Sequence, residues 1–341
     1  MFASLVVTLI VGEITIRALT AHLYRDPLIV TDSHAGWTLK PNLNRATVVF
    51  GGSKFVVSTD NDGHRICYPS GQPPSTESPI LIIVGDSFAM GIGVNDDQTF
   101  AWALARSTPY TIVNLAVPGY GTDQELVKLE DFLAARSGAV VKHIIVLIFD
   151  NDFSDVETAH TYLGRSKPLF SLSGQELVRP KYEANWADHL MDVSRLFWLV
   201  SNKYALIFER SRPPTENGIE VVLVCVKAMR RLAESRGAKL HLFAYHRVKE
   251  PPPLAPWQWE RFVARAGAID ITERVRAARG PDPTGPDGVH WNAVGHALVA
   301  NILSESLKEE ATTPTQNQAN TQAMAPGLPS MTRVRSRAIR R

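Results

Sequence analysis

Apolar runs alternate with helical patterns through the middle of the chain. Apolar runs rich in β-branched residues predict strands at 80–84, 111–117, 140–149, 239–245 and 268–271. Helical spacing of apolar residues predicts helices at about 98–106, 123–135, 216–236 and 292–307. This alternation predicts an α/β domain with a central parallel sheet and right-handed crossovers.

Two stretches depart from simple alternation. The run 221–226 is apolar enough for a strand, but helical spacing continues from it to Gly237, so we predict a helix. An insertion at about 152–212 contains two short segments on either side of a Ser-Gly turn and then a long helical stretch from Trp186 to Arg210. Within that stretch, 196–200 is apolar all round, which favours the core over a lid that faces substrate or membrane.

A small subdomain and a linker are predicted at 24–77. Two β-rich runs, 46–50 and 54–58, flank Gly51-Gly52-Ser53, which is a hairpin signal. The acidic stretch 60–63 invites comparison with a calcium loop, but Pro69 stands where an EF-hand has its bidentate Glu, so we interpret it as a turn. The Pro-rich connector 71–76 then leads to a main domain that begins near Ser78.

The N-terminal segment 1–23 is predicted to be a membrane anchor or a signal-like helix. Residues 2–11 are apolar or small, and Glu13 and Arg17 follow at a spacing that allows them to pair on one helix face. The run is shorter than the roughly 20 residues of a membrane-spanning helix. It also lacks the basic region and the clear cleavage site of a secretory signal. A helix docked on the domain is the alternative. We expect a membrane-associated protein that faces the periplasm or the cell exterior, and the residues leave a cytoplasmic location open.

Composition limits the other partners. The net charge is +2 over 341 residues, so no nucleic-acid partner is expected. The segment 311–341 lacks apolar periodicity and ends in several arginines, which predicts a disordered basic tail. Cys67 and Cys225 are far apart and lack zinc-site spacing, although a bridge between these two stays open.

Polar residues follow the predicted strands where chemistry is expected. Ser87 follows the first strand, Gly119 the second and Asn151 the third, while Asp287 and His290 follow the fifth. Because the carboxyl ends of parallel strands meet at one edge of the sheet, we expect these groups to lie close together. Each alone is as easily a turn or a helix cap, and their shared position is what favours an active site.

The residue types suit nucleophilic catalysis. Asp287 can orient the imidazole of His290, and His290 can act as a base toward the Ser87 hydroxyl. The backbone N–H groups of Ser87 and Gly119, with the side-chain amide of Asn151, can form an oxyanion hole. We interpret Asp86 as a structural member of the turn. A metal site that uses His290 and His296 is disfavoured, because six residues is not a same-face helical spacing, and no metal or cofactor is predicted.

At these residues the sequence resembles the SGNH (GDSL-like) hydrolase family. Gly85-Asp86-Ser87, Gly119, Asn151-Asp152 and Asp287-Gly288-Val289-His290 match the four blocks of the family in order and spacing. The resemblance covers about 78–310 and implies a flavodoxin-like three-layer α/β/α fold with a central parallel sheet, plus the small N-terminal β-hairpin subdomain. It implies Ser87 as nucleophile, His290 as base and Asp287 as its partner, with Ser87, Gly119 and Asn151 as the oxyanion hole.

Two features of the sequence qualify the resemblance. Phe149 replaces a glycine that often precedes the third block, which puts the local backbone in doubt. The Ser-Phe-Ala ending, together with Gly36-Trp37, Lys40-Pro41-Asn42 and Asp62-Gly63-His64-Arg65, is similar to membrane-anchored branches of the family. An α/β-hydrolase is the nearest rival fold, since 85–89 misses its G-x-S-x-G motif by only one residue. It is disfavoured because Ser87 follows the first strand of the domain and because Asp287 and His290 are only three residues apart.

The expected function is therefore ester chemistry. The first hypothesis is a serine esterase that removes acetyl or other short O-acyl groups from a carbohydrate or lipid through an acyl-enzyme. An O-acyltransferase acting on an extracytoplasmic polysaccharide is the alternative, since only the acceptor changes from water to a sugar hydroxyl. A binding protein without catalysis is the third, and it is disfavoured because the complete set of catalytic residue types is present.

Overall fold

The structure is a computed structural model that describes residues 2–20, 28–69, 78–159, 164–208, 213–247 and 253–312. By its contacts the chain divides into a large unit, residues 1–304, and a second unit, residues 305–341. The predicted connector at 71–76 and nearly all of the predicted basic tail lie outside the described residues. The domain boundaries predicted from the sequence stay predictions.

The large unit is built on a five-stranded parallel sheet. Its strands are β5 (Ile80–Gly85), β6 (Thr111–Asn114), β7 (Val141–Phe149), β10 (Lys239–Tyr245) and β11 (Ile269–Asp270). The order across the sheet is β11-β10-β7-β5-β6. If these five strands are numbered 1 to 5 in chain order and the sheet is read from the β6 edge, the order is 2-1-3-4-5. This is the flavodoxin-like order, so the predicted α/β fold is confirmed. The order reverses at β5, and a ligand crevice is expected beside the ends of β5 and β7.

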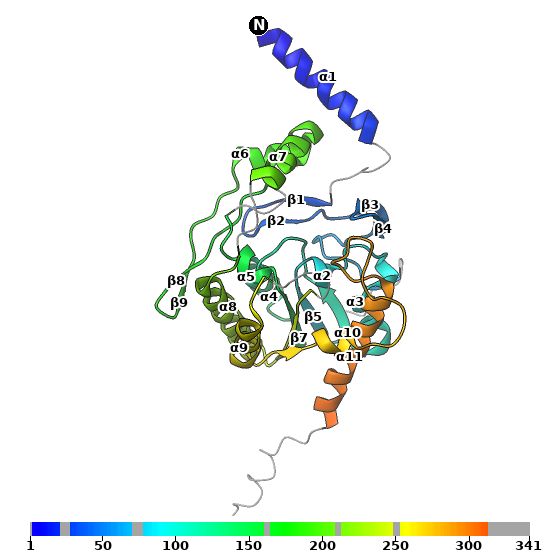
Figure 1. Ribbon diagram of the computed structural model, residues 1–341, viewed down its shortest axis with the longest axis vertical. Helices are drawn as coiled ribbons and strands as arrows, with labels where there is room; N and C mark the ends of the chain where they lie inside the picture. The colour runs from blue at the N-terminus through cyan, green and yellow to red at the C-terminus, as the bar shows by residue number, and fades with distance from the viewer. Residues whose placement is uncertain are drawn as a thin grey trace, which may run out of the picture. The chain divides into compact units, whose positions relative to one another are not determined.

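Helices cover both faces of the sheet (Figure 1). On one face α4 (Thr122–Ala135), α8 (Glu216–Ser235) and α9 (Pro256–Ala266) share a buried core with β5 and β7. On the other face lie α3 (Phe100–Ser107) and the first turns of α11 (Ala293–Thr312). Strand side chains alternate between the faces, so Ile82 and Val84 belong to the first core whereas Leu81 and Ile83 are buried on the second face. The remaining short elements are α2 (Ser87–Met90), the 3₁₀ turn η1 (Asp96–Gln98), α5 (Asp152–Asp155) and α10 (Thr272–Arg276).

Two helices test the sequence patterns. The stretch 221–226 lies within α8, which confirms the helical prediction. Helix α9 was not predicted, because prolines surround its start. Pro256 occupies the first turn, where a missing backbone N–H costs nothing, and Gly267 ends the helix in the left-handed conformation.

The insertion forms a hairpin and two helices. The hairpin is β8 (Ser171–Ser173) with β9 (Glu176–Val178), and the helices are α6 (Trp186–Val193) and α7 (Arg195–Phe208), with a break at Ser194. The prediction that 196–200 belongs to the core is wrong. None of these side chains is buried, and Val200 is 58% exposed. An all-apolar pattern cannot distinguish a core helix from one that packs against another peripheral helix.

Helix α1 (Phe2–Thr20) packs against α7 through a carboxylate. The Glu13 side chain accepts the backbone N–H groups of Arg195 at 3.0 Å and Leu196 at 2.9 Å, and it pairs with Arg17 as expected. Burial raises the pKa of Glu13, but these hydrogen bonds outweigh it and lower the pKa to about 2. Among the described residues, no helix combines the length and apolar character that a membrane crossing requires. The predicted membrane association therefore gains no support.

The N-terminal subdomain consists of two hairpins. The predicted hairpin is confirmed as β3 (Ala46–Phe50) with β4 (Ser53–Val57), and β1 (Ile29–Asp32) pairs with β2 (Gly36–Leu39) in a second that was not predicted. Both β1 and β2 are only four residues long, which is too short for a clear alternating pattern.

Cys67 and Cys225 are free and buried, so the bridge between them that the sequence left open is not formed. Burial raises the pKa of the Cys67 thiol to about 12, which leaves it in the neutral form.

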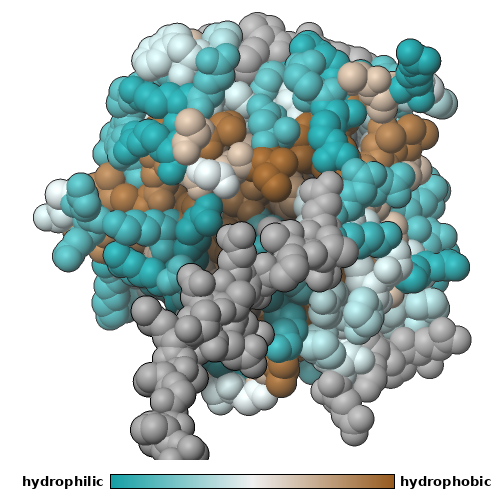
Figure 2. Space-filling view, turned by 90° about the horizontal axis from the view of Figure 1, so that it is seen from below, coloured by the Kyte–Doolittle hydropathy of each residue, from teal (hydrophilic) through white to brown (hydrophobic). Residues whose placement is uncertain are grey.

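The surface carries apolar side chains between hydrophilic ones. Figure 2 shows this mixture on the face seen from below. Exposed apolar side chains of this kind are normal on soluble proteins, and we infer no site from them.

A buried arginine joins the N-terminal subdomain to the loop after α2. The guanidinium of Arg65 donates to the carbonyl oxygens of Met90 at 2.9 Å and Gly91 at 2.6 Å, and of Val56 and Val94. Its Nε donates to Asp96 at 3.0 Å, and its side chain is fully buried. A buried charge is tolerated only when its N–H groups are satisfied, so this network holds the two parts in one arrangement.

We expect Arg65→Met to lower the free energy of unfolding by about 3–5 kcal/mol, because the partner carboxylate and four carbonyl groups lose their donor in the interior. Urea unfolding followed by circular dichroism measures this. The control is Arg265→Met, which removes the half-exposed ion pair with Glu220 and should change the same quantity by about 1 kcal/mol or less. Equal effects of the two substitutions would contradict the stabilising role of Arg65.

Candidate active site

Ser87 lies where the sheet order reverses, directly after β5 and at the first position of α2. The preceding Asp86 caps this short helix, because its carboxylate accepts the Phe88 N–H at 2.9 Å. Asp86 is therefore a structural member of the turn, as the sequence indicated. The turn places Ser87 at the carboxyl end of the sheet, where a ligand crevice is expected, and the residue as a whole is only 9% exposed.

His290 and Asp287 approach Ser87 from the loop before α11. The His290 Nε2 atom lies 2.8 Å from Ser87 Oγ, and its Nδ1 atom lies 2.6 Å from Asp287 Oδ2. The other carboxylate oxygen of Asp287 accepts the backbone N–H groups of Val289 and His290, both at 3.0 Å. With a proton on Nδ1 facing the carboxylate, Nε2 is the acceptor for the Ser87 hydroxyl.

The carboxylate of Asp287 is suited to this orienting position. Burial raises its pKa, but the hydrogen bonds from His290 and from the backbone outweigh burial and bring the pKa below its usual value. Asp287 is therefore ionised at neutral pH. The Ser87 hydroxyl also lies 3.4 Å from the Asp86 carboxylate. The His290 Nε2 atom is closer, at 2.8 Å, and it is the atom that can accept the serine proton.

Two backbone donors remain open beside the serine. Among the described residues, no acceptor binds the backbone N–H of Ser87 or that of Gly119. Gly119 has a φ of 77°, in the left-handed region, which a glycine adopts without strain. These two N–H groups have the chemistry that an oxyanion requires.

Asn151, the third predicted oxyanion donor, has its amide turned toward buried acids. Its Nδ2 atom donates to Asp155 Oδ2 at 2.6 Å, and a hydrogen bond from the same side chain lowers the pKa of Asp86. Its Oδ1 atom is buried and has no hydrogen-bond partner within the described parts of the chain. The structure thus brings Ser87, His290 and Asp287 into contact, whereas it directs Asn151 to Asp155. The catalytic roles of all these residues stay predictions.

Several carboxyl groups are buried beneath the site. The sequence marked Asp86 and Asp152 as parts of the family blocks, whereas nothing in it singled out Asp155 or Glu125. Burial raises the pKa of Asp155 to about 7 and that of Asp86 to about 6. Burial, and then the neighbouring carboxyls, raise the pKa values of Asp152 and Glu125 well above their usual range. This shift favours the uncharged forms of the last two, which lowers the cost of placing several carboxyl groups in the interior.

Aromatic rings form the floor around the imidazole. The ring of Phe88 lies 4.9 Å from that of His290, 5.0 Å from Trp291 and 3.9 Å from Phe149, measured between centroids. Phe149 is the residue that departs from the family pattern. Its ring packs against Phe88. Phe149 is the last residue of strand β7, so the local backbone is that of an ordinary strand.

The N-terminal subdomain contacts the site loops directly. Trp37 is fully buried and donates from Nε1 to the carbonyl of Pro118, next to Gly119. At the tip of the β3–β4 hairpin, the Phe50 ring meets the His290 ring edge to face at 5.6 Å. Gly51, with a φ of 54°, lies so close to Asp287 that an added Cβ would come within 2.4 Å of the Asp287 Cβ atom. In the sequence, the motifs Gly36-Trp37, Lys40-Pro41-Asn42 and Asp62-Gly63-His64-Arg65 marked this segment as part of the family pattern, but none of them indicated the contacts of Phe50 and Gly51.

A group of side chains has the spacing of a metal site. Among the residues that the structure describes, Asp60, Asp62 and His64 are the group close enough to share an ion. However, Asp60 Oδ1 accepts the backbone N–H groups of Asp62 and His64, and Asp62 pairs with Arg136. These hydrogen bonds belong to a turn, which is what the sequence predicted for 60–63.

His296, the other histidine considered for a metal, is fully buried and packs against Phe100, whose backbone N–H it accepts at 3.3 Å. Burial lowers its pKa to about 3, so it is a neutral core residue.

Comparisons with known proteins place these observations in context. The chain matches no model of a protein family and no curated protein. It is similar to the solved structure of TesA, with 16% identity, 67% of this chain and 98% of that chain covered, and a TM-score of 0.40. A lipase/acylhydrolase from Enterococcus faecalis has 12% identity, 68% and 96% coverage and a TM-score of 0.38. A protein from Desulfitobacterium hafniense, described as a putative lipolytic protein of the G-D-S-L family, has 10% identity, 64% and 98% coverage and a TM-score of 0.34. At these values, an assignment of function rests on the geometry of the site.

A fluorophosphonate probe should label Ser87, because the probe reacts with a hydroxyl whose proton can pass to a base. The variant His290→Ala should be labelled at least about 100-fold more slowly, since the base is lost. Mass spectrometry of the folded protein locates and times the label. Ser87→Ala is the blank, and Ser107→Ala, an exposed serine on α3, is the matched control. Labelling of His290→Ala at the normal rate would refute the assignment of His290 as the base.

Proposed function

We propose that this protein is a serine esterase that hydrolyses acetyl or other short O-acyl esters of a carbohydrate or lipid. The observation that carries the proposal is the continuous contact from Asp287 through His290 to Ser87, at 2.6 and 2.8 Å, beside two open backbone N–H groups. A weak hydroxyl nucleophile needs this combination of a base, an orienting carboxylate and oxyanion donors. The similar solved structure that is described as a lipase/acylhydrolase agrees with it.

In the first half of the reaction, Ser87 Oγ attacks the ester carbonyl carbon while its proton passes to His290 Nε2. The negative charge that develops on the carbonyl oxygen is stabilised by hydrogen bonds donated by the N–H groups of Ser87 and Gly119. Asn151 is the third proposed donor, and its amide has to turn from Asp155 to reach this oxygen. Asp287 stabilises the protonated imidazole. His290 then gives the proton to the leaving alcohol oxygen, the C–O bond breaks, and the acyl group remains on Ser87.

In the second half, a water molecule takes the place of the alcohol. His290 accepts a proton from the water as its oxygen attacks the acyl carbon, and the bond to Ser87 Oγ breaks as that proton returns to the serine. The free acid leaves, and the starting protonation state is restored. A sugar hydroxyl in place of water would give acyl transfer by the same steps.

Purified protein should hydrolyse p-nitrophenyl acetate, and Ser87→Ala should reduce the rate to that of the buffer, because no other group supplies the nucleophile. Release of p-nitrophenol measures the rate, and Ser107→Ala serves as the control. Unchanged turnover in Ser87→Ala would exclude this serine as the nucleophile. Acyl transfer to an added oligosaccharide that is much faster than hydrolysis would instead assign the acyltransferase function. Absence of any turnover would favour a binding protein.

The value of kcat/KM for the same ester should fall at acidic pH, because the proposed mechanism needs an imidazole that is free to accept the serine proton. The lowered pKa of Asp287 keeps this carboxylate ionised over that range, so loss of the orienting charge does not contribute until more acidic pH. Stopped-flow kinetics with circular dichroism at each pH separates this effect from unfolding. A flat acid limb with the fold intact would contradict the role of His290.

A further inference from the structure

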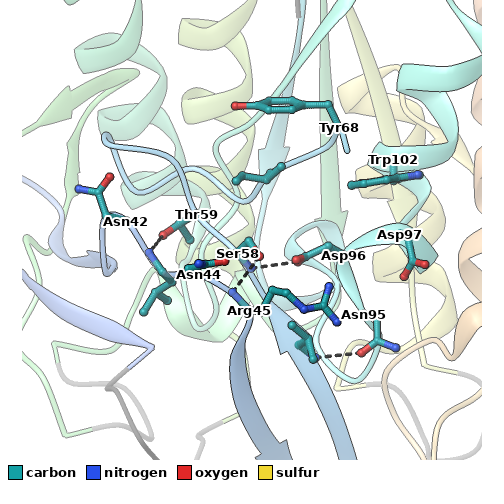
Figure 3. A pocket seen from close by; sticks show the side chains of 13 residues that line it. Asn42, Asn44, Arg45, Ser58, Thr59, Tyr68, Asn95, Asp96, Asp97 and Trp102 are labelled. Atoms are coloured by element: carbon teal, nitrogen blue, oxygen red, sulfur yellow. Dashed lines mark hydrogen bonds between the residues drawn. The ribbon is translucent and has the colours of Figure 1, made fainter. Parts of the chain in front are cut away.

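A polar cleft lies at the base of the β3–β4 hairpin, outside the Ser87 site (Figure 3). Its walls come from the loop before β3, the end of β4, the turn η1 and helix α3. Its volume is about 540 Å³, which is within the usual range for small-molecule sites. We refer to it as the hairpin cleft.

The walls of the hairpin cleft present unused hydrogen-bonding groups. The side chains of Asn44, Arg45 and Asp97 are exposed, and no other described residue forms a hydrogen bond or ion pair with them. Asn95 also lines the cleft, with its Oδ1 atom occupied by the Val56 N–H at 2.9 Å and its amide nitrogen left available. Amides and carboxylates that converge in this way match a ligand rich in hydroxyl groups.

Two aromatic side chains complete the lining. Trp102 from α3 and Tyr68 from the end of the subdomain are both half-buried and border the same space (Figure 3). Aromatic rings that are partly open to water supply apolar faces beside polar groups. Sugar rings have the complementary character, since their C–H faces are apolar and their edges carry hydroxyls.

The charges in the hairpin cleft favour an uncharged ligand. Asp96 and Asp97 place two carboxylates in its wall against the single guanidinium of Arg45. Asp96 is already engaged, because it accepts the Ser58 N–H at 3.1 Å and the Arg65 Nε. With Asp96 balanced by Arg65, the remaining Asp97 and Arg45 carry opposite charges, so the walls have no net charge that would select an anion or a cation.

The backbone of the wall is held in an uncommon conformation. Asn42 and Arg45 have φ values of 58° and 50°, and the left-handed region is rare for a side chain such as arginine. The Asn42 N–H is bound by the Asp60 carbonyl at 2.8 Å, and the Arg45 N–H by Ser58 Oγ at 3.1 Å. Such conformations persist where neighbouring bonds fix them, and they are frequent at ligand-binding loops.

The hairpin connects this cleft to the Ser87 site. Arg45 precedes β3 and lines the cleft, while Phe50 at the other end of β3 contacts His290. Five residues of extended strand span roughly 17 Å, a distance that a chain of a few sugar rings covers. An extended glycan is therefore long enough to reach from the cleft to the acyl group at Ser87.

We infer that the hairpin cleft is a binding subsite for an uncharged glycan chain, several sugar units from the O-acyl group at Ser87. This inference rests on the proposed esterase function and specifies its substrate class as an acylated neutral polysaccharide or oligosaccharide.

The test compares a long substrate with a short one. The long substrates are O-acetylated hexasaccharides with xylose, glucose and mannose backbones, and the short substrate is p-nitrophenyl acetate. Trp102→Ala should raise KM by about tenfold for at least one hexasaccharide, which is the loss expected for one stacking contact. It should leave p-nitrophenyl acetate hydrolysis unchanged, which also shows that the variant folds. Asp97→Ala, at an exposed position, should likewise raise KM for a hexasaccharide and leave p-nitrophenyl acetate hydrolysis unchanged. Trp186→Ala on α6 is the matched control, and it should change neither. Unchanged KM values for all three hexasaccharides in both cleft variants would overturn the inference.

A binding measurement separates this inference from the proposed function. Full-length Ser87→Ala is titrated with the three hexasaccharides without acetyl groups, by isothermal calorimetry. Binding that disappears in Ser87→Ala/Trp102→Ala supports the subsite even if the wild-type protein hydrolyses no ester. If Ser87→Ala binds none of the three hexasaccharides while the wild-type protein still hydrolyses p-nitrophenyl acetate, the subsite inference is overturned. The esterase proposal then stands.

Discussion

The buried guanidinium of Arg65 is the interaction on which the geometry of the site most depends. It comes from the N-terminal subdomain, yet it binds the carbonyl groups of Met90, the last residue of the helix that begins at Ser87, and of Gly91, which follows it. A charge in the interior is stable only when every N–H finds an acceptor, so the loop cannot shift without a large cost in free energy. The subdomain is thereby fixed to the nucleophile loop.

The same subdomain also reaches the other two loops of the site. Trp37 binds the carbonyl before Gly119, and the tip of the β3–β4 hairpin packs on His290 and Asp287. The contact at Gly51 leaves no room for a side chain. The hairpin is therefore part of the wall of the proposed active site, and through its other end at Arg45 it forms part of the proposed glycan subsite.

Beneath the serine, electrostatics limit how the site can be built. Four carboxyl groups there have raised pKa values, and the amide of Asn151 lies between two of them, Asp155 and Asp86. Burial raises the pKa values of Glu125 and Asp152 and so favours their neutral forms, which reduces the cost of acidic side chains in the interior. The ionised Asp287 is separate from this group, because backbone N–H groups and His290 stabilise its charge.

The sequence by itself determined the five strands of the central sheet and the residues at the strand ends, because apolar periodicity and strand-end chemistry are local properties. It therefore placed Ser87, Asp287 and His290 at one edge before any distance was known. Only the tertiary structure decided the direction of the Asn151 amide, the peripheral position of 196–200 and the groups that the Arg65 guanidinium binds. Each of these depends on partners distant in the chain, and a pattern along the sequence carries no information about which distant group will satisfy a buried amide, charge or apolar face.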